Sequence, residues 1–188
     1  VQYSIVIPCM LEAIGNVLGD VETPEIKNAW EEAMVNFSNI IIETESKRYD
    51  DTLVKEGGWK GYKNFTITQK ENESALITSL YLEPADGKPV ATYKAGQYIS
   101  IMLDLPEEGI VFRNYSLSYS PNRKYYRISV KREENGLVSN YLHNTLCQGD
   151  KIKINPPYGC FSLKETGKPA VLISGGVGIT PMMSILQN

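Results

Sequence analysis

The chain has 188 residues and a formal net charge of −3, and its composition is ordinary for a globular protein. No apolar run approaches the ~18 residues that a membrane-spanning helix requires, and the apolar start lacks the basic leader of a signal peptide. Three widely spaced cysteines without a CxxC pair predict reduced cytoplasmic thiols, not a disulfide framework or a metal site. The absence of an initial Met predicts a partial or trimmed chain.

The charge is unevenly distributed along the chain. Residues 1–60 carry eleven acidic and five basic side chains, whereas residues 113–132 carry six basic side chains and no acidic one. Tyrosines interleave this basic run, a pattern compatible with single-stranded nucleic acid as well as with an anionic cofactor. The overall acidity and the lack of a longer basic surface favour the cofactor, so no nucleic-acid partner is expected.

Two helices are predicted at the start. Apolar residues recur at helical spacing over residues 8–19, and a second helix begins after Thr23, with Pro24 at its first position. The apolar stripe of this second helix reaches roughly Tyr49, and the short connection predicts an antiparallel pair. Glu45 lies at the edge of the stripe, where a half-buried carboxylate would need a partner, although its position alone favours an ordinary surface acid.

A different pattern follows the glycine-rich segment 57–61, which we interpret as a domain boundary. Short β-branched and aromatic segments separated by turns predict six antiparallel strands, arranged as a barrel or a sandwich. A short helix is expected at 137–146. The predicted strands cover residues 62–70, 74–82, 97–103, 110–118, 125–131 and 151–155.

The last segment changes character again. Residues 169–174 form a continuous apolar run of the kind found in buried parallel strands. The loop Gly175–Pro181 follows, and a helix is expected from Met182. This order is typical of the first β–loop–α unit of a nucleotide-binding domain, although the loop matches neither GxGxxG nor a Walker motif. A tight strand-to-helix turn explains it equally well.

The segment Arg113-Asn114-Tyr115-Ser116 carries the strongest chemical signal. In a strand, Arg113 and Tyr115 lie on one face and Asn114 and Ser116 on the other. A guanidinium for phosphates, a flat ring for stacking and a hydroxyl for a ring heteroatom together suit a flavin. The turn at Gly136, with the amides of Val138 and Ser139, is a candidate anion site or a plain helix cap. Tyr98 is compatible with the same site or with the core.

Taken together, the motifs Arg113–Ser116, Gly136–Asn140, Pro157–Gly159 and Gly175–Pro181 resemble the ferredoxin–NADP reductase superfamily in order and spacing. A narrower resemblance, to flavohaemoglobins, is carried by four further segments: Gln2–Val6, Asn28–Trp30, Gly57–Trp59 and Lys131–Glu134. In that family a globin is fused to an FAD/NAD(P)H reductase.

This resemblance implies an α+β multi-domain fold. Residues 1–56 would be the C-terminal globin helix pair, residues 57–164 a six-stranded antiparallel Greek-key FAD-binding β-barrel, and residues 165–188 the first βα unit of a Rossmann-like NAD(P)-binding domain. Arg113, Asn114, Tyr115, Ser116 and Tyr98 would contact FAD, together with Val138 and Ser139. The NAD(P)H diphosphate would be bound by Gly176, Val177, Gly178, Ile179, Thr180 and Pro181.

The resemblance also implies the chemistry. Nitric oxide and O₂ would be converted to nitrate, with electrons passing from NAD(P)H to FAD and then to haem. Tyr3 and Glu45 would be the catalytic residues on the haem side, although the helix that carries the proximal histidine is not in this sequence. Haem is therefore expected only in a longer form, and the protein is expected to be a cytoplasmic monomer. A flavin reductase for a separate acceptor, and an inactive remnant or binding module, remain as alternatives.

Overall fold

The computed structural model describes residues 3–164 and 166–188. It divides into two compact units, Val1–Asp51 and Thr52–Asn188, which are described separately. Gln2, which opens one of the motifs of the resemblance, lies outside the described residues.

The first unit consists of helices. Helix α1 spans Tyr3–Leu18, a 3₁₀ turn follows at Gly19–Val21, and α2 begins at Pro24 and continues to Leu53, beyond the boundary of this unit. The start of α2 is the predicted one, because the Thr23 hydroxyl accepts a hydrogen bond from the Ile26 amide at 3.4 Å. Helix α1 begins earlier than predicted and contains Pro8 in its interior.

The length of this first helical segment corrects one expectation. Tyr3–Val21 forms 19 continuous helical residues, and an 18-residue window within it has a mean hydropathy of 1.5, so the segment is long and apolar enough to cross a membrane. The prediction that no segment approaches that length is therefore wrong. Length and composition do not identify a membrane span, however, because the apolar helix of a larger helical core has the same properties.

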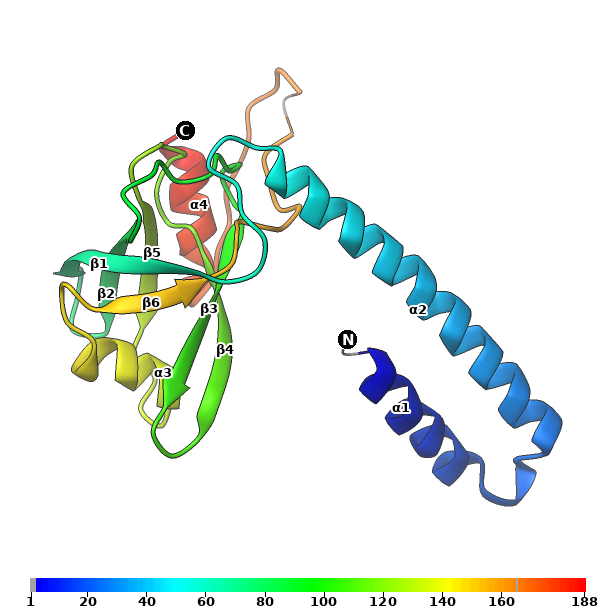
Figure 1. Ribbon diagram of the computed structural model, residues 1–188. Helices are drawn as coiled ribbons and strands as arrows, with labels where there is room; N and C mark the ends of the chain where they lie inside the picture. Colours follow the sequence, from blue (N-terminus) through cyan, green and yellow to red (C-terminus); the bar gives the residue numbers. More distant parts are fainter. Residues whose placement is uncertain (1–2, 165) are drawn as a thin grey trace. The chain divides into compact units, whose positions relative to one another are not determined.

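The second unit is built on one antiparallel six-stranded sheet, as predicted (Figure 1). Its strands follow the order β4-β3-β6-β1-β2-β5 across the sheet. The strands are β1 Lys63–Asn72, β2 Ile77–Pro84, β3 Tyr98–Leu105, β4 Gly109–Ser116, β5 Tyr126–Lys131 and β6 Lys151–Ile154. Just beyond β4, an isolated bridge joins Leu117 to Ile128 of β5, so the two ends of the strand order also meet at one point.

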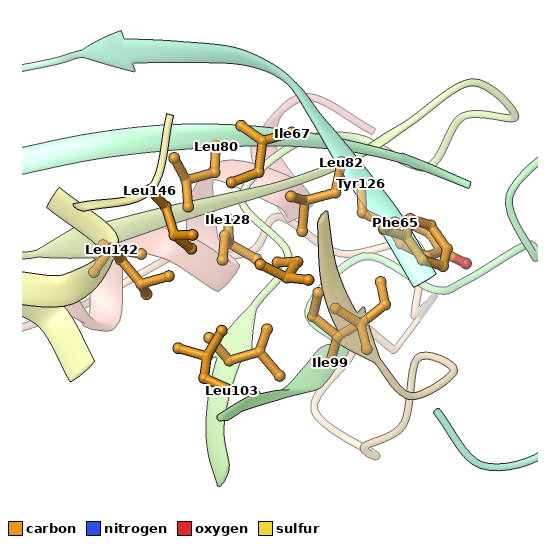
Figure 2. Close-up of a cluster of buried hydrophobic side chains, with 14 of the residues drawn as sticks. Phe65, Ile67, Leu80, Leu82, Ile99, Leu103, Tyr126, Ile128, Leu142 and Leu146 are labelled. Atoms are coloured by element: carbon orange, nitrogen blue, oxygen red, sulfur yellow. The ribbon is translucent and has the colours of Figure 1, made fainter. Parts of the chain in front are cut away.

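The hydrophobic core lies on one face of this sheet (Figure 2). Every second residue of β3 and β5 is buried, which is the period expected of strands with one face toward a core. Tyr126 is fully buried, and its hydroxyl donates a 2.7 Å hydrogen bond to the Ala91 carbonyl. The Phe65 ring stacks on the Tyr126 ring at a centroid distance of 5.7 Å.

A short helical segment between β5 and β6 closes one side of this core. It consists of α3, Leu137–Asn140, and a π-type turn, Tyr141–Thr145, which together correspond to the helix predicted at 137–146. The Lys70 ammonium donates to the carbonyls of His143 and Leu146, at 2.6 and 2.7 Å, and so caps its end. The His143 ring bonds the Thr78 hydroxyl and the Val130 carbonyl, which is a structural role.

The segment after Gly167 differs from the prediction. No strand forms over residues 169–174, and Val171 and Ile173 are 83% and 81% exposed. A parallel strand needs a neighbour to share its backbone hydrogen bonds, and no described segment pairs with this one. A 3₁₀ turn at Gly176–Gly178 leads directly into α4, Ile179–Leu186.

Helix α4 begins three residues before the predicted start. Pro181 is its third residue, a position where the backbone N–H has no partner within the helix, so the missing donor costs little. Within the second unit, α4 lies beside the sheet (Figure 1). The Ser184 hydroxyl, which is fully buried, donates a 2.7 Å hydrogen bond to the Tyr119 carbonyl.

Candidate functional site

A cavity of about 470 Å³ lies where three segments of the second unit converge. The segments are the end of β4, the end of β5 with the turn into α3, and the glycine loop before α4. Its lining residues are Arg113, Asn114, Tyr115, Ser116, Ser129, Lys131, Glu133, Gly136, Leu137, Val138, Ser139, Val177, Gly178, Thr180 and Pro181. Its size is typical of small-molecule sites.

All four residues of the motif Arg113–Ser116 line the cavity. This is possible because their strand, β4, lies at the end of the strand order. Arg113 is paired with Ile101 and Tyr115 with Ile99, both fully buried. Paired residues share a face, so Arg113 and Tyr115 lie on the same face, as predicted. Asn114 and Ser116 lie on the opposite face and still line the cavity, because an outer strand is open along its free side.

The Tyr115 ring is partly buried against the hydrophobic core. Burial raises the pKa of its phenol to about 12, and the nearby Arg113 guanidinium opposes this effect only in part. The phenol therefore stays neutral at physiological pH. Tyr115 presents a flat, uncharged ring to the cavity, with a hydroxyl that can both donate and accept.

The Arg113 guanidinium is exposed, and its Nη1 donates a 2.7 Å hydrogen bond to the carbonyl of Phe112. A guanidinium has five N–H donors, so this bond leaves most of them available to an anion. On the other face of β4, the Asn114 amide oxygen accepts a short hydrogen bond from Ser100 of β3. That contact fixes the Asn114 side chain from outside the cavity.

The turn before α3 is held by its own side chains. The Ser139 hydroxyl accepts from the Glu133 amide and donates to the Gly136 carbonyl, both at 3.1 Å. The Asn140 side-chain amide donates to the Gly136 carbonyl at 2.9 Å. Gly136 is the N-cap residue, and no side chain caps the helix, so the capping explanation of this turn is wrong. A Cβ on Gly136 would lie 2.4 Å from the Ser139 hydroxyl, so the turn has no room for a side chain there.

The glycine loop is divided between two cavities. Val177, Gly178, Thr180 and Pro181 line the cavity described above. Gly176 and Ile179 line a neighbouring cavity of about 430 Å³, to which Val177 and Thr180 also contribute. The Thr180 hydroxyl donates to the Val177 carbonyl at 2.9 Å and so closes the loop.

Three predicted site residues lie elsewhere. Tyr98 is paired with Ser116 across the strands and exchanges two 2.9 Å backbone hydrogen bonds with Tyr158, but it does not line the cavity. Tyr3 and Glu45 belong to the first unit, where the Tyr3 hydroxyl donates a 3.0 Å hydrogen bond to the Glu45 carboxylate. Partial desolvation, followed by this hydrogen bond, raises the pKa of the Tyr3 phenol.

Several lining residues were missed from the sequence: Ser129, Lys131, Glu133 and Leu137. Ser129 and Lys131 alternate along β5 with buried residues, and that period was the available signal. Lys131 also belongs to the basic run, but its ammonium pairs with the Glu133 carboxylate at 2.7 Å. This pair lowers the net charge of the cavity rim and leaves Arg113 as the cation that lines the cavity without a carboxylate partner among the described residues.

The rest of the described chain offers no second site among the residues predicted from the sequence. A larger cavity of about 730 Å³ is lined by Arg123, Lys124 and Tyr125 of the basic run, but by none of the predicted site residues. No group of three or more His, Cys, Asp or Glu side chains in residues 3–164 and 166–188 is placed to hold a metal ion. The three cysteines are exposed and free.

Comparison with known proteins identifies the class. Residues 64–163 match the family described as oxidoreductase FAD-binding domain, and the chain belongs to that family. Over its whole length it is 47% identical to a flavohemoprotein of Pseudomonas aeruginosa, of which it covers 48%, and 49% identical to one of Bacillus subtilis, of which it covers 47%. The resemblance to flavohaemoglobins is thus confirmed, and the chain spans about half the length of these curated relatives.

Comparison with solved structures also finds flavohemoglobins and related reductases. The crystal structure of a flavohemoglobin from Malassezia yamatoensis with bound FAD and heme is 27% identical, with a TM-score of 0.85 over 98% of this chain and 48% of that one. The flavohem-like FAD/NAD-binding domain of nitric oxide dioxygenase from Vibrio cholerae is 48% identical, with a TM-score of 0.63 over 66% of this chain and 55% of that one. Phthalate dioxygenase reductase, at 31% identity and a TM-score of 0.61, is also similar, over 68% of this chain and 39% of that one.

Proposed function

We propose that the cavity beside β4 binds FAD and that the chain passes electrons from NAD(P)H through this flavin toward haem, in the conversion of nitric oxide and O₂ to nitrate. The observation that carries the proposal is the convergence of three segments, each predicted separately, on one cavity in a member of an FAD-binding family. The flavohemoprotein relatives supply the acceptor and the overall reaction.

The residues present fit the cofactor. The exposed Arg113 guanidinium suits the diphosphate, and the neutral Tyr115 ring suits the face of the isoalloxazine. Ser116 and Asn114 would lie close to the ring heteroatoms, and the backbone of Val138 and Ser139 would meet the diphosphate. When bound, the flavin would accept a hydride and release single electrons.

The glycine loop, Gly176–Pro181, is proposed to receive the NAD(P)H diphosphate. Glycines without a Cβ allow close approach to the backbone, and α4 directs its N-terminal amides toward the loop. We further propose that the sheet is a closed Greek-key barrel and that the last residues begin a Rossmann-like unit. The Leu117–Ile128 bridge supports closure of the barrel, and the loop leading into α4 supports the start of a Rossmann-like unit.

We also propose the domain limits 1–56, 57–164 and 165–188, and a contact of Tyr98 with FAD. We propose that α1 and α2 belong to a haem-binding part, in which Tyr3 and Glu45 support the ligand of the iron. Their hydrogen bond supports this pairing. Haem itself requires residues that this chain does not contain. The three free, exposed cysteines suit a reducing compartment such as the cytoplasm.

The test is the affinity of the 188-residue chain for FAD, measured by the quenching of flavin fluorescence. Arg113→Ala removes a charge-assisted contact and should weaken binding by about 1.5–3 kcal/mol, which is roughly 10- to 150-fold in Kd. Arg132→Ala is the matched control, because it removes the same charge from an exposed residue of the same basic run that does not line the cavity. It should change the binding free energy by no more than about 0.5 kcal/mol.

Equal affinities of the two variants would remove Arg113 from the site. A chain that binds no FAD would overturn the proposed function as a whole.

A second candidate function is a reductase for a separate acceptor. The similarity to phthalate dioxygenase reductase, described as transferring electrons from pyridine nucleotides to [2Fe-2S], favours it, because the same kind of unit serves a different acceptor there. The hydrogen bond between Tyr3 and Glu45 in the first unit favours the first proposal, in which haem is the acceptor. A simple reductase would have no haem ligand for this pair to support.

A further inference from the structure

Three serine hydroxyls, in the order Ser118, Ser129 and Ser79, form a hydrogen-bonded line that ends at a carboxylate, and the second of them lines the cavity. Ser129 lines the cavity, and its hydroxyl lies 2.8 Å from that of Ser118 and 2.7 Å from that of Ser79. The Ser79 hydroxyl in turn donates a 2.7 Å hydrogen bond to Glu73. The residues come from β5, β2, the segment just after β4 and the turn between β1 and β2, so they are not adjacent in the sequence.

The direction of these hydrogen bonds follows from counting protons. Each hydroxyl has one hydrogen, and an ionised carboxylate only accepts. Because Ser79 donates to Glu73, it must accept from Ser129, and Ser129 must then accept from Ser118. The alternative acceptor for Ser118, the Arg127 carbonyl, is farther away, at 3.3 Å. All three hydroxyl hydrogens therefore point toward Glu73.

The line ends at the Glu73 carboxylate, which is stabilised in its charged form and is in contact with solvent. Hydrogen bonding from Ser79, followed by that from the Arg127 guanidinium, lowers the pKa of the Glu73 carboxyl. Arg127 is held in turn above the rings of Tyr81 and Tyr119, with 5.6 and 5.9 Å between its guanidinium carbon and the ring centroids. The Glu73 side chain is 34% exposed, so it can exchange protons with water.

The residue that connects Ser129 to Glu73 is shielded from water. Ser79 is fully buried, and Ser118, which donates to Ser129, is 2% exposed. Electrostatic interactions are stronger in such surroundings, and hydrogen bonds in a row polarise one another. Ser129 is therefore open to the cavity, Ser79 is shielded, and the Glu73 carboxylate is in contact with water. Ser118, Ser129 and Glu73 also line the neighbouring cavity of about 430 Å³.

We propose that Ser129, Ser79 and Glu73 form a proton path that removes the proton released in the cavity when the flavin is reoxidised. This inference rests on the proposed function, in which the hydride comes from NAD(P)H and both electrons leave for the acceptor. One proton must then leave the cavity. The Ser129 oxygen takes it as the Ser129 hydrogen passes to Ser79 and the Ser79 hydrogen passes to Glu73. Glu73 becomes a neutral acid and gives its proton to water, and rotation of the hydroxyls restores the line.

The first test needs no flavin. In the 188-residue chain labelled with ¹³C at glutamate carboxyls, the Glu73 signal is titrated by NMR. Ser79→Ala should raise the pKa of Glu73 toward its ordinary value, because it removes the largest cause of the lowering. Ser129→Ala should raise it less, because Ser79 loses the donor that polarises it. An unchanged Glu73 titration in Ser129→Ala would show that the line is not connected and would overturn the proposal.

The second test measures the rate of flavin reoxidation and its dependence on solvent deuterium. The chain loaded with FAD is reduced anaerobically with dithionite and mixed with ferricyanide in H₂O and in D₂O. Ser129→Ala should slow reoxidation on the order of 10²-fold, the lower end of what positioned proton transfer contributes, and should alter the solvent isotope effect. Ser129→Thr, which restores the hydroxyl, should recover most of the rate.

Thr68→Val is the matched control. Thr68 lies in β1 and lines neither of the two cavities that Ser129 lines. Its hydroxyl donates a long, 3.5 Å hydrogen bond to the Tyr81 carbonyl, outside the line. It should leave both the Glu73 titration and the reoxidation rate unchanged. Equal rates for the FAD-loaded wild type and Ser129→Ala would refute the proton path alone, whereas failure of the chain to bind FAD would refute the proposed function and the path with it.

Discussion

Gly96 occupies a position where a side chain has no room. Its φ is +96°, and a Cβ built on it would lie 2.1 Å from the carbonyl oxygen of Phe161. The next residue, Gln97, donates from its side-chain amide to the Gly159 carbonyl at 3.0 Å, which ties the segment around residue 160 to the start of β3. Gly96→Ala should therefore displace the contact between the start of β3 and the segment around residue 160.

The cost has two parts. An alanine at positive φ costs about 1–2 kcal/mol, since its Cβ approaches its own backbone. The collision with Phe161 involves backbone atoms that cannot rotate away, and overpacking of this kind adds about 1–3 kcal/mol. Gly61→Ala isolates the first part, because Gly61 has a φ of +72° and no heavy atom within 4 Å of its added Cβ.

Urea unfolding, followed by circular dichroism, measures both variants. Gly61→Ala should lower the free energy of unfolding by about 1–2 kcal/mol, and Gly96→Ala by about 2–5 kcal/mol. The shift should appear in the transition midpoint, with the denaturant dependence unchanged. Equal losses for the two variants would show that the contact between Gly96 and Phe161 does not exist in solution.

Two further predictions concern the tyrosines. Because folding raises the pKa of Tyr115 from 10.0 to about 12, the neutral phenol is favoured in the folded state, and the associated stability is complete below pH 10 and lost as the pH rises through 12. Tyr115→Phe should lose less stability than the wild type over that interval in urea unfolding, and parallel curves would contradict the burial of Tyr115. In the first unit, Glu45→Gln should lower the pKa of Tyr3, measured by NMR of ring-labelled tyrosine, because the carboxylate that raises it is removed. Desolvation, the larger cause, should remain, and an unchanged Tyr3 titration would refute the Tyr3–Glu45 contact.

The sheet could be predicted from the sequence because its signals are local. Tyr126–Lys131 alternates buried and less buried residues, and the strands end at glycines, prolines and asparagines that favour turns. The helix start at Thr23 and Pro24 is equally local. The error at 169–174 has a physical cause, since an apolar run shows that a segment is suited to a parallel strand but not that a neighbour is present to pair with it.

The candidate site could be predicted only in part. The motif Arg113–Ser116 was found because its chemistry is concentrated in four consecutive residues. Ser129 was missed because the hydrogen bonds that distinguish it are made with Ser79 and Ser118, which are distant in sequence. A serine in a strand carries no signal by itself. Only the residues beside it in the folded sheet show whether its hydroxyl faces solvent or is hydrogen-bonded to other side chains.

The position of β4 explains why the cavity forms where it does. A strand at the end of the strand order has free backbone groups along one side, which favours unwanted pairing unless something covers them. Here the Leu117–Ile128 bridge joins β4 to β5 at one point only, and the turn at Gly136 and the loop at Gly178 approach the remaining length without pairing with it. The open side of the strand is thereby converted into a lined cavity. A flat, phosphate-bearing molecule held there would cover the free side of β4, so binding and protection of the strand would be achieved by the same contact.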